Sequence, residues 1–122
     1  MDSLKLLCEL NAPSGHENAV RDYIIDRIKD KAEISVDALG NIIAFVKGNK
    51  RAQKRIMVDA HMDEVGFIVT YITADGMLKF TTVGGINTAV MIARKVEFLN
   101  GVKGVISSKP VHMLTSSEIE KM

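Results

Sequence analysis

The sequence has a single cysteine, almost no excess of charge of either sign and no long hydrophobic run. Because Cys8 has no partner in the chain, an intramolecular disulfide is excluded and a reducing compartment is favoured. No stretch approaches the roughly 18 apolar residues of a membrane-spanning helix. Asp2 and Lys5 interrupt the first apolar residues, so a signal peptide is not expected. We therefore expect a cytoplasmic protein.

The charges are balanced, with 16 basic and 15 acidic residues and a formal net charge of +1. This balance favours neither a nucleic-acid partner nor an anionic membrane surface. The densest basic stretch, residues 47–55, contains no aromatic side chain and is expected to be a solvated loop. With 47% apolar residues, the 122-residue chain is expected to bury a modest core and not to be disordered.

Helical spacing marks the first part of the sequence. Residues 3–10 place Cys8 on an apolar helix face, which predicts that its thiol is buried as a small hydrophobe. After a loop at residues 11–15, a second helix is predicted over residues 16–31, because Val20, Ile24 and Ile28 recur every four residues. The spacing of Ser14 and Glu17 predicts a capping box at its start.

From residue 34 the apolar period changes from four to two, which is typical of strands. Asp75-Gly76 and Asn100-Gly101 predict tight hairpin turns, and Gly84-Gly85 a further backbone turn. A polar helix is predicted to begin at residue 115. The first half is thus α/β and the second mostly β, and we place a domain boundary near Thr70, between residues 1–70 and 71–122. Strands are predicted over residues 34–38, 42–46, 55–60, 67–73, 77–83, 91–99 and 102–107.

His61 and Asp63 are the residues best suited to chemistry, and they lie at the end of the predicted strand 55–60. Open α/β sheets bind ligands at the carboxyl ends of their strands, and a histidine there offers an imidazole nitrogen to a metal ion. Asp63 is placed to accept the other imidazole N–H and to fix the tautomer. Spacing alone leaves a second interpretation open, in which His61 is a surface histidine paired with a neighbouring carboxylate.

Four other polar residues are weaker candidates. Glu64 is a further carboxylate and directly follows Asp63. Asp59 shares the predicted strand face, where it either touches the site or forms a structural hydrogen bond. His16 and His112 are expected to be exposed or structural and not to be ligands, although the sequence leaves their roles open.

Several segments, in order, resemble one enzyme family. Residues 12–17 (A-P-S-G-H-E) resemble its P-S-G-x-E loop, and residues 37–41 (D-A-L-G-N) its D-x-L-G-N hairpin. Residues 60–66 read A-H-M-D-E-V-G, like its metal motif, and residues 83–86 read V-G-G-I. Residues 104–112 resemble its G-V-I … K-P-x-H element. The family comprises glutamyl, deblocking and tetrahedral aminopeptidases, some of which carry an endoglucanase label.

The resemblance implies a fold and a site. The fold is the N-terminal part of a phosphorylase/peptidase-like α/β catalytic domain, followed by the first part of an inserted β-rich, PDZ-like dimerisation domain. The implied enzyme is cytoplasmic, forms dimers and twelve-subunit shells, and removes N-terminal residues from peptides with two divalent metal ions, zinc or cobalt. His61 would ligate one metal ion, and Asp63 would orient that histidine. A bridging aspartate, a Glu-Glu pair, a further aspartate and a final histidine would lie downstream of this chain.

The resemblance covers nearly the whole chain but only about one third of a family member. We therefore predict the N-terminal portion of a metallo-aminopeptidase that is inactive alone and binds at most one metal ion weakly, since stable zinc sites take three or four ligands. Two alternatives stay open, a non-catalytic assembly or binding module and a truncated, degenerate gene product. The sequence does not choose between zinc and cobalt, identify the preferred N-terminal residue, or say whether the short chain is native or is completed by another chain.

Overall fold

The computed structural model of the protein describes residues 3–50 and 53–108. They belong to two compact units, one within Met1–Gly85 and the other within Ile86–Met122. Both helices and strands are present, which confirms the mixed α/β class. The domain boundary near Thr70 and the PDZ-like character of the second domain remain predictions. The predicted tail helix from residue 115 lies outside the described residues.

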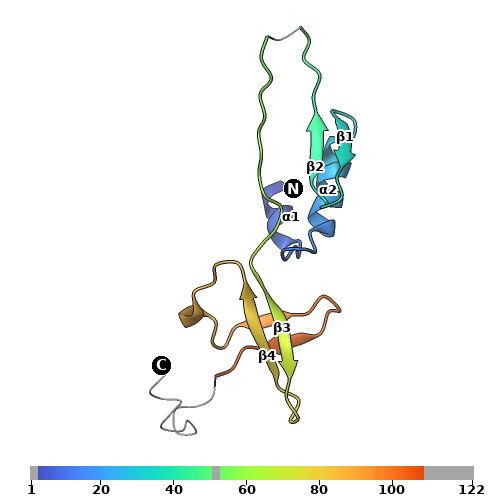
Figure 1. Ribbon diagram of the computed structural model, residues 1–122. Helices are drawn as coiled ribbons and strands as arrows, with labels where there is room; N and C mark the ends of the chain where they lie inside the picture. Colours follow the sequence, from blue (N-terminus) through green and yellow to red (C-terminus); the bar gives the residue numbers. More distant parts are fainter. Residues whose placement is uncertain (1–2, 51–52, 109–122) are drawn as a thin grey trace. The chain divides into compact units, whose positions relative to one another are not determined.

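Two helices open the first unit, α1 (Ser3–Glu9) and α2 (Asn18–Ile28) (Figure 1). In α2, Val20 is buried and two isoleucines one and two turns later are half-buried, as the four-residue spacing predicted. Cys8 is exposed, so its predicted burial is wrong. The reason is that α1 buries none of its residues, since the described chain covers its apolar face only in part.

The start of α2 differs from the prediction. The helix begins at Asn18, with Glu17 as an N-cap that makes no side-chain capping bond. Ser14 lies too far before this position to cap the helix, and its hydroxyl donates instead to Asp63. The Glu17 carboxylate accepts from the Gly15 N–H at 2.6 Å. The capping box is therefore absent, because the N-cap of α2 is Glu17 and Ser14 lies outside the first turn of the helix.

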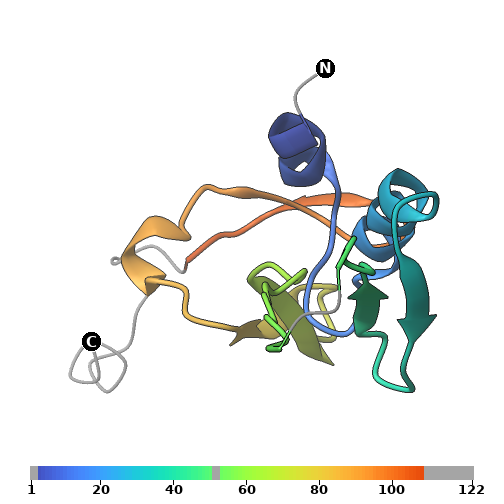
Figure 2. The same cartoon turned by 90° about the horizontal axis from the view of Figure 1, so that it is seen from above.

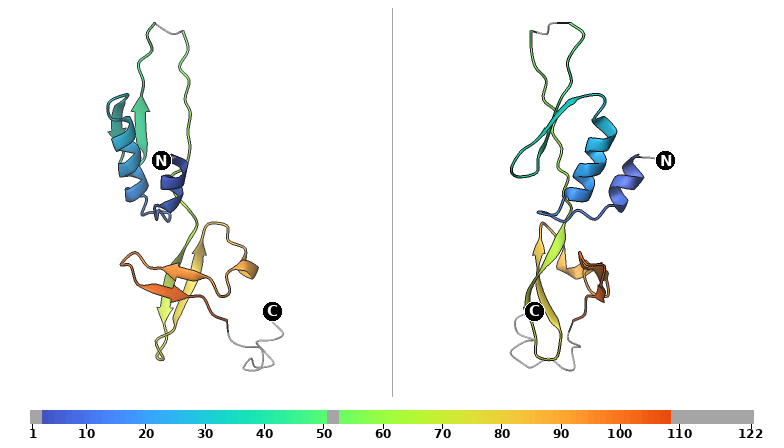
Figure 3. Two further views of the ribbon diagram at one scale, coloured as in Figure 1. Left: turned by 180° about the vertical axis from the view of Figure 1, so that it is seen from behind. Right: turned by 90° about the vertical axis from the view of Figure 1, so that its right-hand side faces the viewer.

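Strands β1 (Glu33–Val36) and β2 (Ile42–Phe45) form an antiparallel hairpin that runs beside α2 (Figures 1 and 3). Asp37 organises the turn. Its carboxylate accepts from the Leu39 and Asn41 backbone N–H groups at 2.9 Å and from the Asn41 side-chain amide at 2.8 Å. These bonds, led by that of the Asn41 side chain, hold the pKa of Asp37 below its ordinary value of 3.8.

We expect this hairpin to lose stability in acid through Asp37. Its pKa is lower in the folded chain than in the unfolded chain, so the bonds stabilise the fold above 3.8 and are lost as the pH falls through 3.8 toward the folded value. Asp37→Asn should make the acid dependence shallower, which urea unfolding between about pH 5 and about pH 2.5 would measure. Asp59→Asn, which removes an exposed carboxylate elsewhere, is the control. Equal pH slopes for Asp37→Asn and the unaltered chain would contradict the assignment.

Residues 55–60 are extended but form no strand in the structure, so the strand predicted there is wrong. A strand needs a hydrogen-bonded neighbour, and none of the described strands pairs with this segment. Ile56, Met57 and Val58 are 91%, 86% and 89% exposed. Consecutive apolar residues are typical of a strand covered on both faces, and the described residues supply no such cover.

Strands β3 (Gly66–Ile72) and β4 (Leu78–Val83) pair in antiparallel register, with an irregularity at Thr70. The Asp75-Gly76 turn is confirmed, with Gly76 at φ 84°. Phe67 and Phe80 contact each other edge to face, with ring centroids 5.0 Å apart. The first residue of β3 lies opposite the last residue of β4, so the pairing fixes the chain directly after residues 61–65.

The second unit contains a 3₁₀ helix, η1 (Thr88–Val90), and the antiparallel strands β5 (Lys95–Glu97) and β6 (Lys103–Val105) (Figure 2). The predicted Asn100-Gly101 turn is confirmed, with Gly101 at φ 83°. The strands predicted at 91–99 and 102–107 are too long. Ala93 takes φ 64°, a left-handed conformation that interrupts an extended chain.

Little of the described chain is buried. Its buried apolar residues are Ala12 and Val20 in the first unit and Ile106 in the second. Many large apolar side chains on β2 and β3 are exposed. The described residues therefore form only a thin core in each unit. Across residues 3–50 and 53–108, no helix has the length and apolar character needed to cross a bilayer.

Candidate functional site

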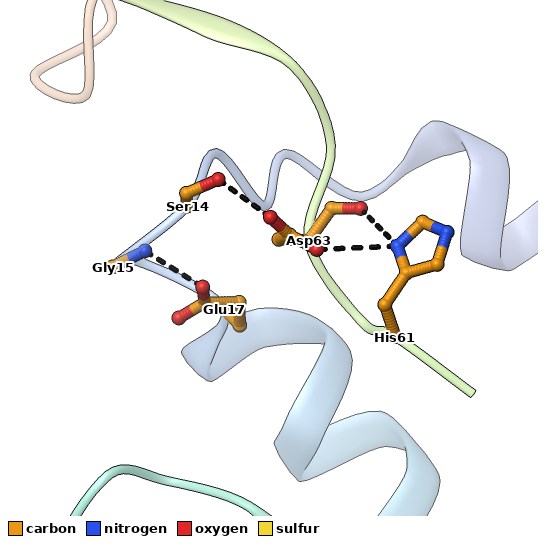
Figure 4. A network of polar contacts seen from close by, with 5 residues as sticks. All are labelled: Ser14, Gly15, Glu17, His61 and Asp63. Carbon is orange, nitrogen blue, oxygen red and sulfur yellow. Dashed lines mark hydrogen bonds and ion pairs between the residues drawn. The ribbon is translucent and has the colours of Figure 1, made fainter. Parts of the chain in front are cut away.

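His61 lies five residues before β3, and its side chain is 85% exposed. Its ring nitrogen Nδ1 lies 2.9 Å from the Asp63 carbonyl oxygen and 3.1 Å from Asp63 Oδ1 (Figure 4). Both oxygens are acceptors, so in the neutral ring Nδ1 carries the proton and donates it. This tautomer leaves a lone pair on Nε2, which makes no hydrogen bond within the described part of the chain.

The Asp63 carboxylate is held on its other side by Ser14. Oδ2 accepts from the Ser14 hydroxyl at 2.5 Å, while Oδ1 faces His61 (Figure 4). The Ser14 bond, followed by the contact with His61, holds the pKa of Asp63 below its ordinary value of 3.8 and keeps the carboxylate ionised at neutral pH. The predicted contact between His61 and Asp63 is therefore present. Ser14 was not predicted, because it lies 49 positions away and no local pattern links it to Asp63.

The loop at residues 12–15 also forms hydrogen bonds with Glu64, so it contacts the A-H-M-D-E-V-G segment (residues 60–66, the motif below) at a second point. Glu64 Oε1 accepts from the Ala12 N–H at 2.9 Å, and the Glu64 N–H donates to the Ala12 carbonyl at 2.8 Å. Pro13 and Glu64 form an isolated parallel β-bridge. The Glu64 carboxylate, a weak candidate from the sequence, thus holds the loop against the motif.

Two glycines allow backbone segments to approach the end of the motif closely. A Cβ added at Gly84, which has φ 86°, would lie 2.9 Å from Val65 Cγ1. A Cβ added at Gly66 would lie 3.0 Å from the Cβ of Pro13. The V-G-G-I segment and the P-S-G loop therefore both pack against residues 61–66, and each contact depends on a missing side chain.

An apolar hollow of about 280 Å³ lies between α1 and the motif. Leu7, Cys8, Val20 and Met62 line it, together with the two acidic residues of the motif. Although a thiol and two carboxylates border this hollow, they do not form a group able to hold a metal ion.

The remaining candidates do not join His61. Asp59 and His16 are exposed, and neither side chain makes a hydrogen bond within the described ranges. His112 lies outside the described residues. No group of three His, Cys, Asp or Glu side chains that could hold a metal ion occurs within residues 3–50 and 53–108. Because a stable zinc site takes three or four ligands, the described residues offer one imidazole and do not by themselves form a complete metal site.

Comparison with known proteins identifies a family whose sequences resemble this chain. Residues 40–122, which include His61 and Asp63, match the family model for the M42 glutamyl aminopeptidases. The lysyl aminopeptidase of Pyrococcus furiosus is 37% identical over 115 residues, and the match covers 90% of this chain and 32% of that protein.

Two solved structures are also similar. The TET aminopeptidase from Thaumarchaeota archaeon SCGC AB-539-E09 is 39% identical with a TM-score of 0.82, and the match covers 98% of this chain and 34% of that one. The TET1 peptidase of Pyrococcus horikoshii, which can assemble into a tetrahedron or a large octahedral shell, is 38% identical with a TM-score of 0.72. That match covers 93% of this chain and 34% of the other. The chain thus spans about a third of the length of these relatives.

Proposed function

This chain belongs to the M42 glutamyl aminopeptidase family, and from that membership we propose that it is the N-terminal part of a metal-dependent aminopeptidase that removes N-terminal residues from peptides. The observation that carries the proposal is the His61–Asp63 pair, which lies within the family match and leaves an imidazole nitrogen open to a ligand. A single cysteine supports a cytoplasmic location.

His61 would bind one of two divalent metal ions, zinc or cobalt, through Nε2. Asp63 orients the ring by accepting the proton of Nδ1, which fixes the tautomer that can donate a lone pair. Metal ions bound in the complete site would polarise the scissile carbonyl and activate a water molecule for attack. In this chain the chemistry of the described residues is confined to presenting one ligand in the correct tautomer.

We further propose that the 122-residue chain is inactive alone. It offers one imidazole where a stable site takes three or four ligands, and it spans about a third of the length of its relatives. The ligands that complete the site, and the group that moves the proton, would come from the remaining part of such a protein.

Assembly is a second candidate function, favoured by the exposed apolar side chains of β2, β3 and residues 56–58. Each sheet in the described residues has two strands and therefore open edges. A relative that assembles into a tetrahedral or octahedral shell supports a homo-oligomer from dimer to dodecamer in the complete protein.

A protein chimera tests the proposed enzyme. In it, this chain replaces the matching first third of the Pyrococcus furiosus lysyl aminopeptidase, and the donor supplies the remainder. The chimera should release p-nitroaniline from lysyl p-nitroanilide only when zinc or cobalt is present, and the 122-residue chain should release none above the blank.

The donor's C-terminal part expressed alone is the control, and it should be inactive because it lacks His61 and its partners. A folded, metal-loaded chimera without activity would overturn the proposed enzyme. Activity from the 122-residue chain alone would overturn its dependence on a downstream part.

A further inference from the structure

We propose that Ser14 is a positioning residue for His61 and acts through the Asp63 carboxylate, which it holds in the orientation that keeps Nδ1 protonated and Nε2 open. The inference rests on the proposed function only in one respect, namely that the group bound by Nε2 is a metal ion. The hydrogen-bonded chain from Ser14 through Asp63 to His61 is a property of this protein's own residues.

His61 has few other restraints. No β-ladder holds the residues before it, because residues 55–60 pair with no described strand. The ring is 85% exposed, so packing does not select its rotamer. Within the described residues, the polar contacts of the ring are the two from Nδ1 to Asp63. The orientation of the imidazole therefore depends on Asp63, through its backbone carbonyl and through the carboxylate, and only the carboxylate contact changes when the Asp63 side chain turns.

Asp63 is itself free to rotate unless something holds it, because its side chain is 40% exposed. Ser14 supplies that restraint by donating to Oδ2 at 2.5 Å. An O–H donor on a carboxylate is among the stronger protein hydrogen bonds. With Oδ2 occupied by Ser14, Oδ1 is the oxygen directed at His61, at 3.1 Å from Nδ1.

The backbone that carries Ser14 is fixed relative to the motif. Ala12 and Glu64 exchange two hydrogen bonds immediately before it, and the His16 N–H donates to the Pro13 carbonyl immediately after it. The Ser14 hydroxyl does not cap α2, whose N-cap is Glu17. Within the described residues its hydrogen bond is to Asp63.

The test is the tautomer of His61 in the full 122-residue chain. With ¹⁵N-labelled histidine, long-range proton–nitrogen NMR distinguishes the two neutral tautomers directly, and His61→Gln identifies the signal. The unaltered chain should show mainly the Nδ1–H form. Ser14→Ala should lower the ratio of the Nδ1–H to the Nε2–H form about fivefold, the effect expected for one hydrogen bond.

Four further variants test this interpretation. Ser14→Thr keeps the hydroxyl and should restore the tautomer ratio, whereas Asp63→Ala should change it more than Ser14→Ala does. Ser35→Ala removes an exposed hydroxyl on β1 that makes no hydrogen bond within the described residues, and should leave the tautomer ratio unchanged. If Ser14→Ala does not fold, Ser14→Cys keeps the volume and a weak donor, and should give an intermediate ratio.

A Ser14→Ala ratio equal to that of the unaltered chain would overturn the inference, as would an unaltered chain with His61 mainly in the Nε2–H form. A purely structural role for Ser14 would lower stability without moving the tautomer ratio of the folded protein. Because the measurement needs no metal and no substrate, it is independent of the chimera assay. An inactive chimera with the expected tautomer shift would overturn the proposed enzyme and leave the role of Ser14 standing.

Discussion

Replacing His61 with alanine in the chimera should lower kcat/KM for lysyl p-nitroanilide by more than about 100-fold. Loss of a residue that merely orients a metal ligand typically costs about 10–100-fold in affinity or activity, and loss of the ligand itself should cost more. In the 122-residue chain the side chain is 85% exposed, so its removal costs this part of the chimera little packing. A folded variant that has lost its activity together with its metal would show that His61 is a ligand.

The measurement is steady-state kinetics together with the metal content of each variant. His16→Ala is the matched control, since this histidine belongs to the same unit, is exposed, and makes no side-chain bond within the described ranges. It should retain activity within about twofold, as expected of a surface substitution. A His61→Ala chimera that keeps a tenth of the activity at saturating zinc would remove His61 from the ligand set.

The chain of contacts orders the effects of three substitutions. His61→Ala removes the ligand, Asp63→Ala removes its orienting carboxylate, and Ser14→Ala removes a restraint on that carboxylate. Each step lies one hydrogen bond further from the metal, so the loss of metal affinity should decrease in this order. Ser14→Ala is expected near the lower end of the range of about 10–100-fold.

The sequence predicted α2 and two of the hairpin turns, because each of these elements is determined by residues that are close together along the chain. The four-residue spacing of Val20, Ile24 and Ile28 gives α2 its inward face. Asp75-Gly76 and Asn100-Gly101 give hairpin turns because glycine accepts the positive φ that each turn needs. These causes act within a few residues, so a pattern in the sequence carries them.

The errors arose where a segment depends on distant residues. The apolar pattern of residues 55–60 is that of a covered strand, but no described strand pairs with it, and the segment is extended and exposed. Cys8 is exposed for a similar reason, because α1 buries none of its residues. The spacing of Ser14 and Glu17 predicts a local capping box, whereas the N-cap of α2 is Glu17 and the Ser14 hydroxyl donates to Asp63, 49 positions away.

In the candidate site, one contact follows from local spacing and the others depend on residues far away in the sequence. The contact of His61 with Asp63 follows from a spacing of two residues and was predicted. The expected reason for its position, the carboxyl end of a paired strand, is not met by the described residues. The motif is held instead by the loop at residues 12–15, through Ser14 and through Ala12, and these contacts have no signature in local spacing.

Gly84→Ala should lower the free energy of unfolding of the 122-residue chain by about 2–5 kcal/mol. A left-handed conformation costs a non-glycine residue about 1–2 kcal/mol, and Gly84 has φ 86°. The new Cβ would also lie 2.9 Å from Val65 Cγ1, so one of the two must move. Overpacking of this kind adds about 1–3 kcal/mol. Because typical domains are stable by only about 5–15 kcal/mol, the urea midpoint should fall substantially.

Substitutions at two other glycines separate the conformational cost from the overpacking cost. Gly76→Ala meets no atom within 4 Å but has φ 84°, so it should show the conformational cost alone. Gly85→Ala has neither feature and should be nearly neutral. Val65→Ala combined with Gly84→Ala should recover the overpacking part, since Val65 is 55% exposed and its own loss costs little. If Gly84→Ala were no more destabilising than Gly76→Ala, the close packing of the V-G-G-I segment on the motif would be wrong. If the double variant recovers stability, the overpacking in Gly84→Ala comes from the contact with the Val65 side chain.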